Sequence, residues 1–194
     1  HKDLNLFQGI LFLNISKNFL SDICPKNDSP YSFLSLTKSF DISFNYISHL
    51  FKYCFQGHSA LENLFLSNNK IDKIDGGAFF GSETISKLDL SFNKISTLDN
   101  DCFHGIKKME YLNLEGNDII ILEPNVFSEI EISSLGSPSF KVCCLYKKSE
   151  NVCTVTWHWI SSCDDLLSST AMKVIIWFVA FLSIFFNIVC FVLK

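Results

Sequence analysis

The sequence predicts an α/β fold, in which a leucine-rich-repeat solenoid with a concave parallel sheet leads through a short disulfide hinge to one transmembrane α-helix. Three observations predict it: an asparagine that returns at a constant spacing, a cluster of four cysteines, and a long apolar segment near the end. The asparagines stand in the frame L-x-x-L-x-L-x-x-N-x-L, which marks leucine-rich repeats. They are Asn45, Asn69, Asn93 and Asn117.

The repeats are expected to fill residues 1–140, as about five units and a degenerate last one. An earlier copy ends at Asn18, and its longer step to Asn45 indicates a small insertion, three positions beyond the regular spacing. A phenylalanine recurs with the same period as the asparagines, and stacked repeats would bury these rings in one column. The column is Phe55, Phe79, Phe103 and Phe127.

The cysteines among the repeats are interpreted as unpaired. Cys54 and Cys102 hold one repeat position, where a small buried residue fits, so both are expected to be free thiols. They stand two repeats apart, roughly 10 Å, which is too far for a mutual disulfide. Cys24, in the inserted loop, and Cys190, in the apolar segment, are assigned no partner.

Four cysteines mark the expected hinge, residues 141–170. Zinc is the competing explanation for the cluster, but two of the four are adjacent and no C-x₂-C spacing occurs. Two disulfides are the preferred reading, and two of the three pairings stay open because a bridge between adjacent cysteines is strained. The candidates are Cys143, Cys144, Cys153 and Cys163.

The apolar segment predicts a membrane-spanning helix within residues 171–194. Val174 to Leu193 is long enough to cross the hydrocarbon core, at about 30 Å. Within it, Asn187 needs polar partners, so it is expected to face other helices of a bundle, or a second copy of the chain. The sequence begins with His1 and ends one residue after this segment, which favours a fragment cut at both ends.

Two sequons and the cysteines favour a plasma-membrane protein with extracellular repeats. Asn14-Ile15-Ser16 and Asn27-Asp28-Ser29 match the acceptor motif for N-linked glycans. Disulfides also belong to oxidising compartments.

The junction between repeats and span resembles the leucine-rich-repeat G-protein-coupled receptors, the relaxin receptors most closely. Cys144, Cys153, Ile160-Ser161-Ser162 and Asp164-Asp165-Leu166-Leu167 keep that family's order and spacing, as do Lys173, Trp177 and Asn187. Val155, His158-Trp159 and Phe186 depart from it. The resemblance implies that the span is the first of seven helices, with a heterotrimeric G protein as a partner.

The concave face is the expected ligand site. Residues between the leucines of each L-x-L point outward by simple alternation. Carboxylates beside exposed aromatic rings suit a peptide or protein hormone that carries arginines, as relaxin-like hormones do. The candidate residues are Asp41, Phe65, Asp89, Tyr111, Asn113 and Glu115.

Other function classes find no support in the sequence. The net charge of −4 argues against nucleic acid. No catalytic motif stands out, so neither an enzyme nor a cofactor is expected. The sequence therefore predicts a hormone receptor that contacts membrane lipid. The alternatives are a single-pass adhesion or co-receptor protein, and a soluble repeat protein with a buried C-terminal helix.

Overall fold

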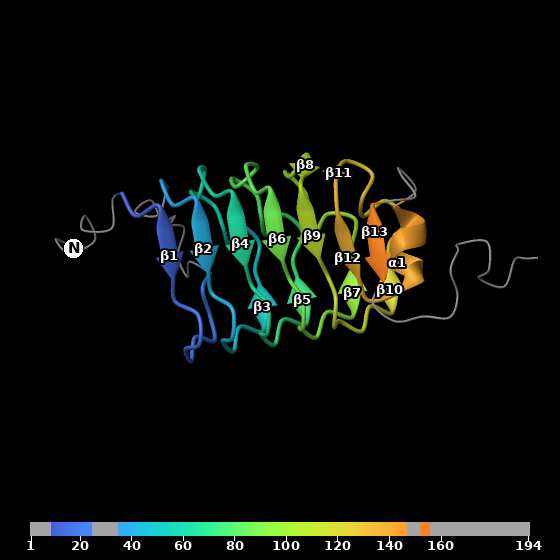
Figure 1. Cartoon of the computed structure of the whole chain (residues 1–194), viewed down its shortest axis with the longest axis horizontal. Helices are drawn as coiled ribbons and strands as arrows, with labels where there is room; N and C mark the ends of the chain where they lie inside the picture. The colour runs from blue at the N-terminus through green and yellow to red at the C-terminus, as the bar shows by residue number, and fades with distance from the viewer. Residues whose placement is uncertain (1–8, 25–34, 147–151, 156–194) are drawn as a thin grey trace, which may run out of the picture. The chain divides into compact units, whose positions relative to one another are not determined.

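A computed structural model of the chain describes residues 9–24, 35–146 and 152–155 (Figure 1). All of them belong to one compact unit, residues 1–157. Within this unit the chain winds as a solenoid, and successive turns lie side by side from the blue end of the ribbon to the orange end (Figure 1).

Among the described residues, the main sheet has seven parallel strands, one from each turn. Interior strands pair one repeat period apart, as in Asn63 with Lys87, whereas Phe12 pairs with Ser39 across a longer turn. The extra length is three positions, so the predicted insertion is confirmed. In sheet order the strands are β1 (Phe12–Asn14), β2 (Ser39–Asp41), β4 (Asn63–Phe65), β6 (Lys87–Asp89), β9 (Tyr111–Asn113), β12 (Leu135–Ser137) and β13 (Cys153–Val155).

Short strands pair between turns away from the main sheet. They form three parallel pairs, β3 with β5, β7 with β10 and β8 with β11, which tie neighbouring turns at two further places (Figure 1). Their bounds are β3 (His49–Leu50), β5 (Lys73–Ile74), β7 (Thr97–Leu98), β8 (Lys108–Met109), β10 (Ile121–Leu122) and β11 (Glu131–Ile132). The helix in the described part of the chain is α1 (Phe140–Leu145), between β12 and β13.

The middle residues of β4, β6 and β9 point into the core, and in β12 the first residue, Leu135, takes this place. Leu64, Leu88 and Leu112 are fully buried. They are register partners of one another and stack along the sheet. A single turn could not enclose these side chains, so each turn depends on its neighbours for burial.

The recurring asparagines form a buried hydrogen-bond ladder, as expected for the repeat. Asn93 Oδ1 accepts the N–H of Ile71 at 3.0 Å, and its Nδ2 donates to the carbonyls of Leu66 and Leu90. Asn69 Nδ2 donates to the Leu66 carbonyl as well. Asn45 and Asn117 repeat the scheme, and all four side chains are buried. Each asparagine therefore supports its own turn and the preceding one.

The phenylalanine column is confirmed. Phe55, Phe79, Phe103 and Phe127 stack with ring centroids 5.6–6.1 Å apart and interplanar angles of 5–16°. At one end, the buried ring of His58 lies edge-on to Phe55. Burial lowers the pKa of His58, although hydrogen bonds to the backbone at Phe55 and Gln56 oppose the shift.

Tyr146, directly after α1, closes the other end of the column. Its ring lies edge-on to Phe127 at 6.0 Å. Its hydroxyl accepts the N–H of Ile132 and donates to the carbonyl of the same residue, at 2.6 and 2.9 Å. The sequence pattern did not reveal this cap, because Tyr146 lies outside the repeat period.

The prediction for Cys54 was wrong. Cys54 forms a disulfide with Cys24, and the two Cα atoms lie 4.4 Å apart. The two cysteines belong to neighbouring turns. The inserted loop places Cys24 beside Cys54, and the repeat spacing does not reveal this position. Cys102 is free and buried, as predicted, and burial raises the pKa of its thiol.

The hinge cysteines form disulfides where the structure describes them. Cys143, in α1, is bonded to Cys153, in β13, and Cys144 is disulfide-bonded too. The bridge ties the helix to the last strand of the sheet, which pairs with β12. Cys163 and Cys190 lie outside the described residues, as does the predicted span, Val174 to Leu193. In the part of the chain that the structure describes, no helix is long and apolar enough to cross a membrane.

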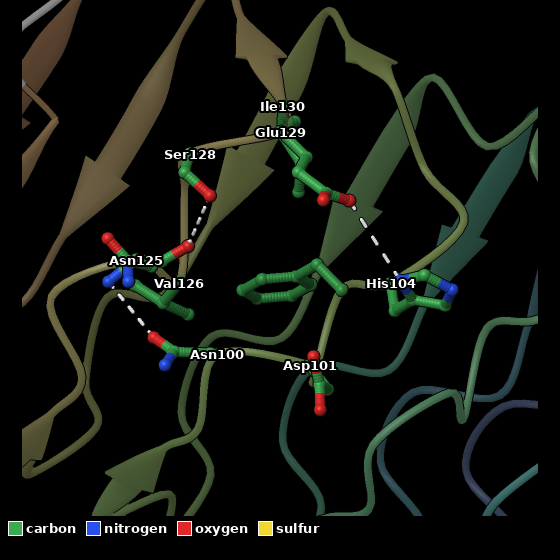
Figure 2. Close-up of a pocket in the computed structure, with 9 residues that line it drawn as sticks. Asn100, Asp101, His104, Asn125, Val126, Ser128, Glu129 and Ile130 are labelled. Atoms are coloured by element: carbon green, nitrogen blue, oxygen red, sulfur yellow. Dashed lines mark hydrogen bonds and ion pairs between the residues drawn. The ribbon is translucent and has the colours of Figure 1, made fainter.

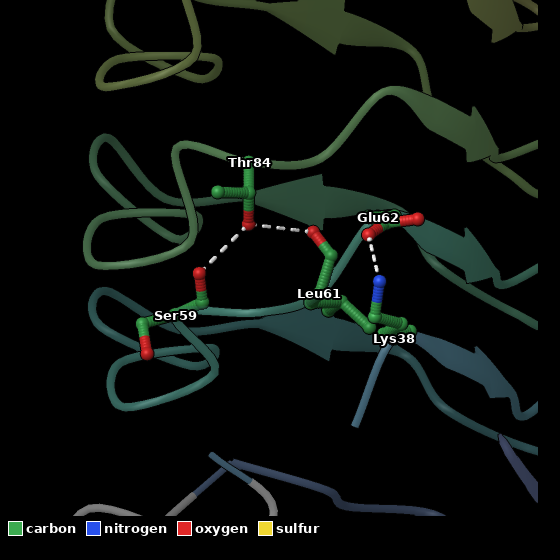
Figure 3. A network of polar contacts seen from close by, with 5 residues as sticks. All are labelled: Lys38, Ser59, Leu61, Glu62 and Thr84. Atoms are coloured by element: carbon green, nitrogen blue, oxygen red, sulfur yellow. Dashed lines mark hydrogen bonds and ion pairs between the residues drawn. The ribbon is translucent and has the colours of Figure 1, made fainter. Parts of the chain in front are cut away.

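Polar side chains join the turns just before the main strands. Lys38 Nζ lies 2.8 Å from Glu62 Oε1, and Thr84 Oγ1 donates to the carbonyls of Leu61 and Ser59 (Figure 3). The lysine and the glutamate are about half exposed, so this ion pair adds little stability.

Candidate ligand-binding face

The outward residues of the main sheet form a face of parallel columns. Register places Asn14 beside Asp41, Asp41 beside Phe65, Phe65 beside Asp89, and Asp89 beside Asn113. We call this the concave face, which also includes Tyr111 and Glu115 at either end of the L-x-L of β9. The register thus places the six residues predicted as ligand contacts on one face of the sheet, spread over four strands.

Asp41 is engaged by its neighbours. Its Oδ1 accepts hydrogen bonds from the backbone N–H and the hydroxyl of Ser43, at 3.0 and 2.6 Å. Its Oδ2 accepts one from Asn14 Nδ2 at 3.0 Å. Both oxygens are occupied, so a ligand would have to compete with these bonds.

Asp89 is more available. Its Oδ1 accepts the N–H of Ser91 at 3.0 Å, and its second oxygen makes no hydrogen bond to a described residue. Lys87, on the same strand, is the register partner of Tyr111, and its Nζ lies 3.9 Å from Glu110 Oε2. The carboxylate of Asp89 therefore keeps a free acceptor on the open side of the sheet.

Asp89 and Glu115 both lie close enough to Tyr111 for their negative charges to act on its phenol. Burial raises the pKa of Tyr111, and the negative charges of Asp89 and Glu115 raise it further. The phenol thus stays protonated and can donate a hydrogen bond. Two carboxylates beside a phenol form a negative cluster with an apolar wall.

Phe65 and Asn113 flank this cluster differently. Phe65 is half-buried between Asp41 and Asp89 in the register, so part of its ring stays open. Asn113 is buried, and its Oδ1 accepts the N–H of Glu115 at 3.1 Å. A Cβ added at Gly136 would lie 2.6 Å from that oxygen, so the glycine makes room for it. Asn113 thus offers little surface to a ligand.

One structural role on this face escaped the sequence pattern. Asn14, Asp41, Asp89 and Asn113 each accept the N–H of the residue two places later, at 2.9–3.1 Å. These bonds satisfy the backbone where each strand ends. The signal in the sequence is an Asn or Asp two places before Ser or Glu in four repeats, with Phe65 as the exception.

A hollow of about 270 Å³ lies elsewhere, in the loops from β7 to β8 and from β10 to β11 (Figure 2). Its polar groups bind one another: Asn100 Oδ1 accepts the N–H of Asn125, and Ser128 donates to the Asn125 carbonyl. His104 Nδ1 lies 3.9 Å from Glu129. Among the described residues, no three His, Cys, Asp or Glu side chains converge to hold a metal ion.

Three remaining site predictions fall on residues that the structure does not describe. They are the sequon at Asn27, the hinge cysteine Cys163 and the polar contact at Asn187. The sequon at Asn14 is described, and that side chain is exposed on β1.

Comparison with known families gives one result. The leucine rich repeat model matches three overlapping segments, residues 35–95, 59–119 and 83–134. No curated protein matches the chain. Solenoids of such repeats are typically non-enzymatic scaffolds with protein-interaction or receptor-like roles. Since the three matches together cover more than half of the chain, it belongs to the leucine-rich-repeat family.

Proposed function

We propose that the chain is part of a G-protein-coupled receptor for a peptide or protein hormone of the relaxin type. The hormone binds the concave face, and residues 171–194 contribute the first helix of a seven-helix bundle at the plasma membrane. The proposal rests on the carboxylates of Asp89 and Glu115, which lie near Tyr111 on the concave face, with one oxygen of Asp89 free of hydrogen bonds to described residues. The resemblance of the cysteine junction to relaxin receptors supports the membrane half.

The cluster suits an arginine of the ligand. A guanidinium can donate hydrogen bonds to both carboxylates, and a protonated phenol can donate one to a neighbouring carbonyl. Phe65 offers an apolar contact beside it. Ligand binding there would act on the bundle only if it stabilised one of two arrangements of the helices.

Disulfides support an extracellular position for the repeats. Cys24–Cys54 and Cys143–Cys153 both lie in the repeat unit, and such bonds persist in oxidising compartments. The G protein would then act on the other side of the bilayer, through helices and loops beyond this chain.

Binding of arginine-containing relaxin-type peptides to the full chain in detergent micelles tests the concave face. Asp89→Asn keeps the acceptor for Ser91 and removes the charge, so affinity is expected to fall about tenfold or more. The control is Asp99→Asn, an exposed aspartate outside the sheet. Equal affinities for Asp89→Asn and the control would refute this site.

The gene sequence after Lys194 tests the membrane half separately. A short basic loop and a second apolar span are expected for a receptor bundle. A long polar tail would favour the single-pass adhesion or co-receptor protein instead.

A further inference from the structure

The residues just before Asn18 and the four ladder asparagines share an unusual backbone conformation. All five have positive φ, between 52° and 68°. The N–H groups of the first four donate to a carbonyl of the next turn, so the repeat itself imposes this conformation. The five are Lys17, Phe44, Asn68, Phe92 and Gly116.

Two of these positions carry residues that the conformation disfavours. Glycine and asparagine adopt positive φ most easily, as Gly116 and Asn68 do here, whereas a bulky side chain is strained there. Phe44 and Phe92 are nonetheless 50% and 57% exposed. Burial therefore offsets only part of their strain. Backbone strain of this kind concentrates at functional sites.

More aromatic rings lie on the same loops, two residues further along each turn. Phe19 and Tyr46 stack with centroids 5.9 Å apart, and Lys70 Nζ lies 4.3 Å above the Tyr46 ring. Lys17 Nζ lies 5.8 Å from the Phe44 ring. Rings and lysines thus lie together on the loops of neighbouring turns.

We call these residues the loop strip: Lys17, Phe19, Phe44, Tyr46, Lys70, Phe92 and Lys94. Its rings and lysines are all exposed. None of the three lysines forms an ion pair with a described residue. The fifth repeat has neither a ring nor a lysine at the equivalent positions, which are Gly116 and Asp118.

We propose that the loop strip binds an extended acidic segment of a protein partner, with aromatic side chains between the carboxylates. Lysines without an ion pair attract carboxylates, and the exposed parts of the rings can pack against further rings. Successive turns lie roughly 5 Å apart, so the strip is a line that an extended chain can follow. This surface lies on the loops after the main strands, beside the Glu115 end of the concave face, where the Phe92 N–H donates to the Glu115 carbonyl. The proposal does not depend on the hormone proposal.

A random copolymer of glutamate and tyrosine, labelled with fluorescein, is the probe. Fluorescence anisotropy measures its binding to the full chain in phosphatidylcholine nanodiscs, with polyglutamate and polylysine as comparisons. We expect the copolymer to bind more tightly than polyglutamate, polylysine not to bind, and salt to weaken binding. Preferential binding of phosphatidylserine vesicles, or self-association of the chain through the strip, would overturn the proposal.

The repeat supplies its own substitution for the rings. Phe44→Asn with Phe92→Asn installs the residue found at position 68, and is expected to weaken copolymer binding about tenfold. The free energy of unfolding should stay the same or rise, since strain is relieved. The matched control is Phe80→Asn, an exposed ring outside the strip. A loss of stability in the double variant, or equal loss of binding in the control, would contradict the proposal.

Discussion

Replacing two neighbouring ladder asparagines should lower the free energy of unfolding by more than the sum of the two single replacements. Asn93→Ala deprives the Ile71 N–H of its partner, while the Leu66 and Leu90 carbonyls each keep a second asparagine. One orphaned buried N–H costs about 1–3 kcal/mol. The same reasoning applies to Asn69→Ala, which orphans the N–H of Ile47.

The double variant Asn69→Ala with Asn93→Ala orphans a further group. Both asparagines donate to the Leu66 carbonyl, at 3.0 Å each, so that carbonyl loses all its side-chain donors only in the double variant. The coupling energy is therefore expected to be about 1–2 kcal/mol, in the destabilising direction.

Asn45→Ala with Asn93→Ala is the matched control, because these two asparagines share no acceptor. Their effects should add to within about 0.5 kcal/mol. Urea unfolding of the full chain in a mild detergent, followed by circular dichroism, gives the four free energies of each cycle. Coupling of equal size in both pairs, or none in the neighbouring pair, would refute the shared-carbonyl argument.

Three further predictions concern other parts of the fold. The folded-state pKa of His58 lies below its ordinary 6.5, so the unfolded chain binds the extra proton first as the pH falls. The free energy of unfolding should therefore decrease below pH 6.5, by up to about 1.4 kcal/mol per pH unit. Urea unfolding of His58→Phe should lack this decrease, and an unchanged slope in the variant would refute the assignment to His58. Reduction of Cys24–Cys54, or its loss in Cys54→Ser, should cost about 3–4 kcal/mol for a loop closed over 30 residues, and a cost near zero would show that the loop orders without it. In animal cells, Asn14→Gln should lower the mass of the protein by one glycan. The Asp41 carboxylate lies 3.0 Å from the Asn14 amide, so carbodiimide labelling of Asp41 should then rise. Unchanged labelling would show that the glycan leaves Asp41 accessible.

The features tied to the repeat period could be predicted from the sequence. Each ladder asparagine and each phenylalanine of the column has one position per turn, so spacing alone fixes its environment. The longer step from Asn18 to Asn45 likewise fixed the register of β1 with β2. Outward alternation in the L-x-L segments also placed Asp89 and Tyr111 on one face.

Features outside the period could not be predicted in this way. The disulfide of Cys54 depends on the path of an inserted loop, and Tyr146 reaches the ring column from a helix. Burial of Asn113 depends on close packing against Gly136, in a turn that is one position shorter than the turn before it. Periodicity reports which face a side chain takes, but not how closely the neighbouring turn approaches it.

The hydroxyl of Tyr146 has a consequence for how such a chain can change in length. In a parallel pair, alternate backbone groups point to opposite neighbours, and those of Ile132 face away from β8. The Tyr146 hydroxyl binds both the N–H and the C=O of Ile132, which the backbone of another turn would otherwise bind. Whole repeats can therefore be gained or lost by duplication or deletion in the interior, while the same terminal closure is kept. Growth directly after Ile132 would require that closure to be dismantled first.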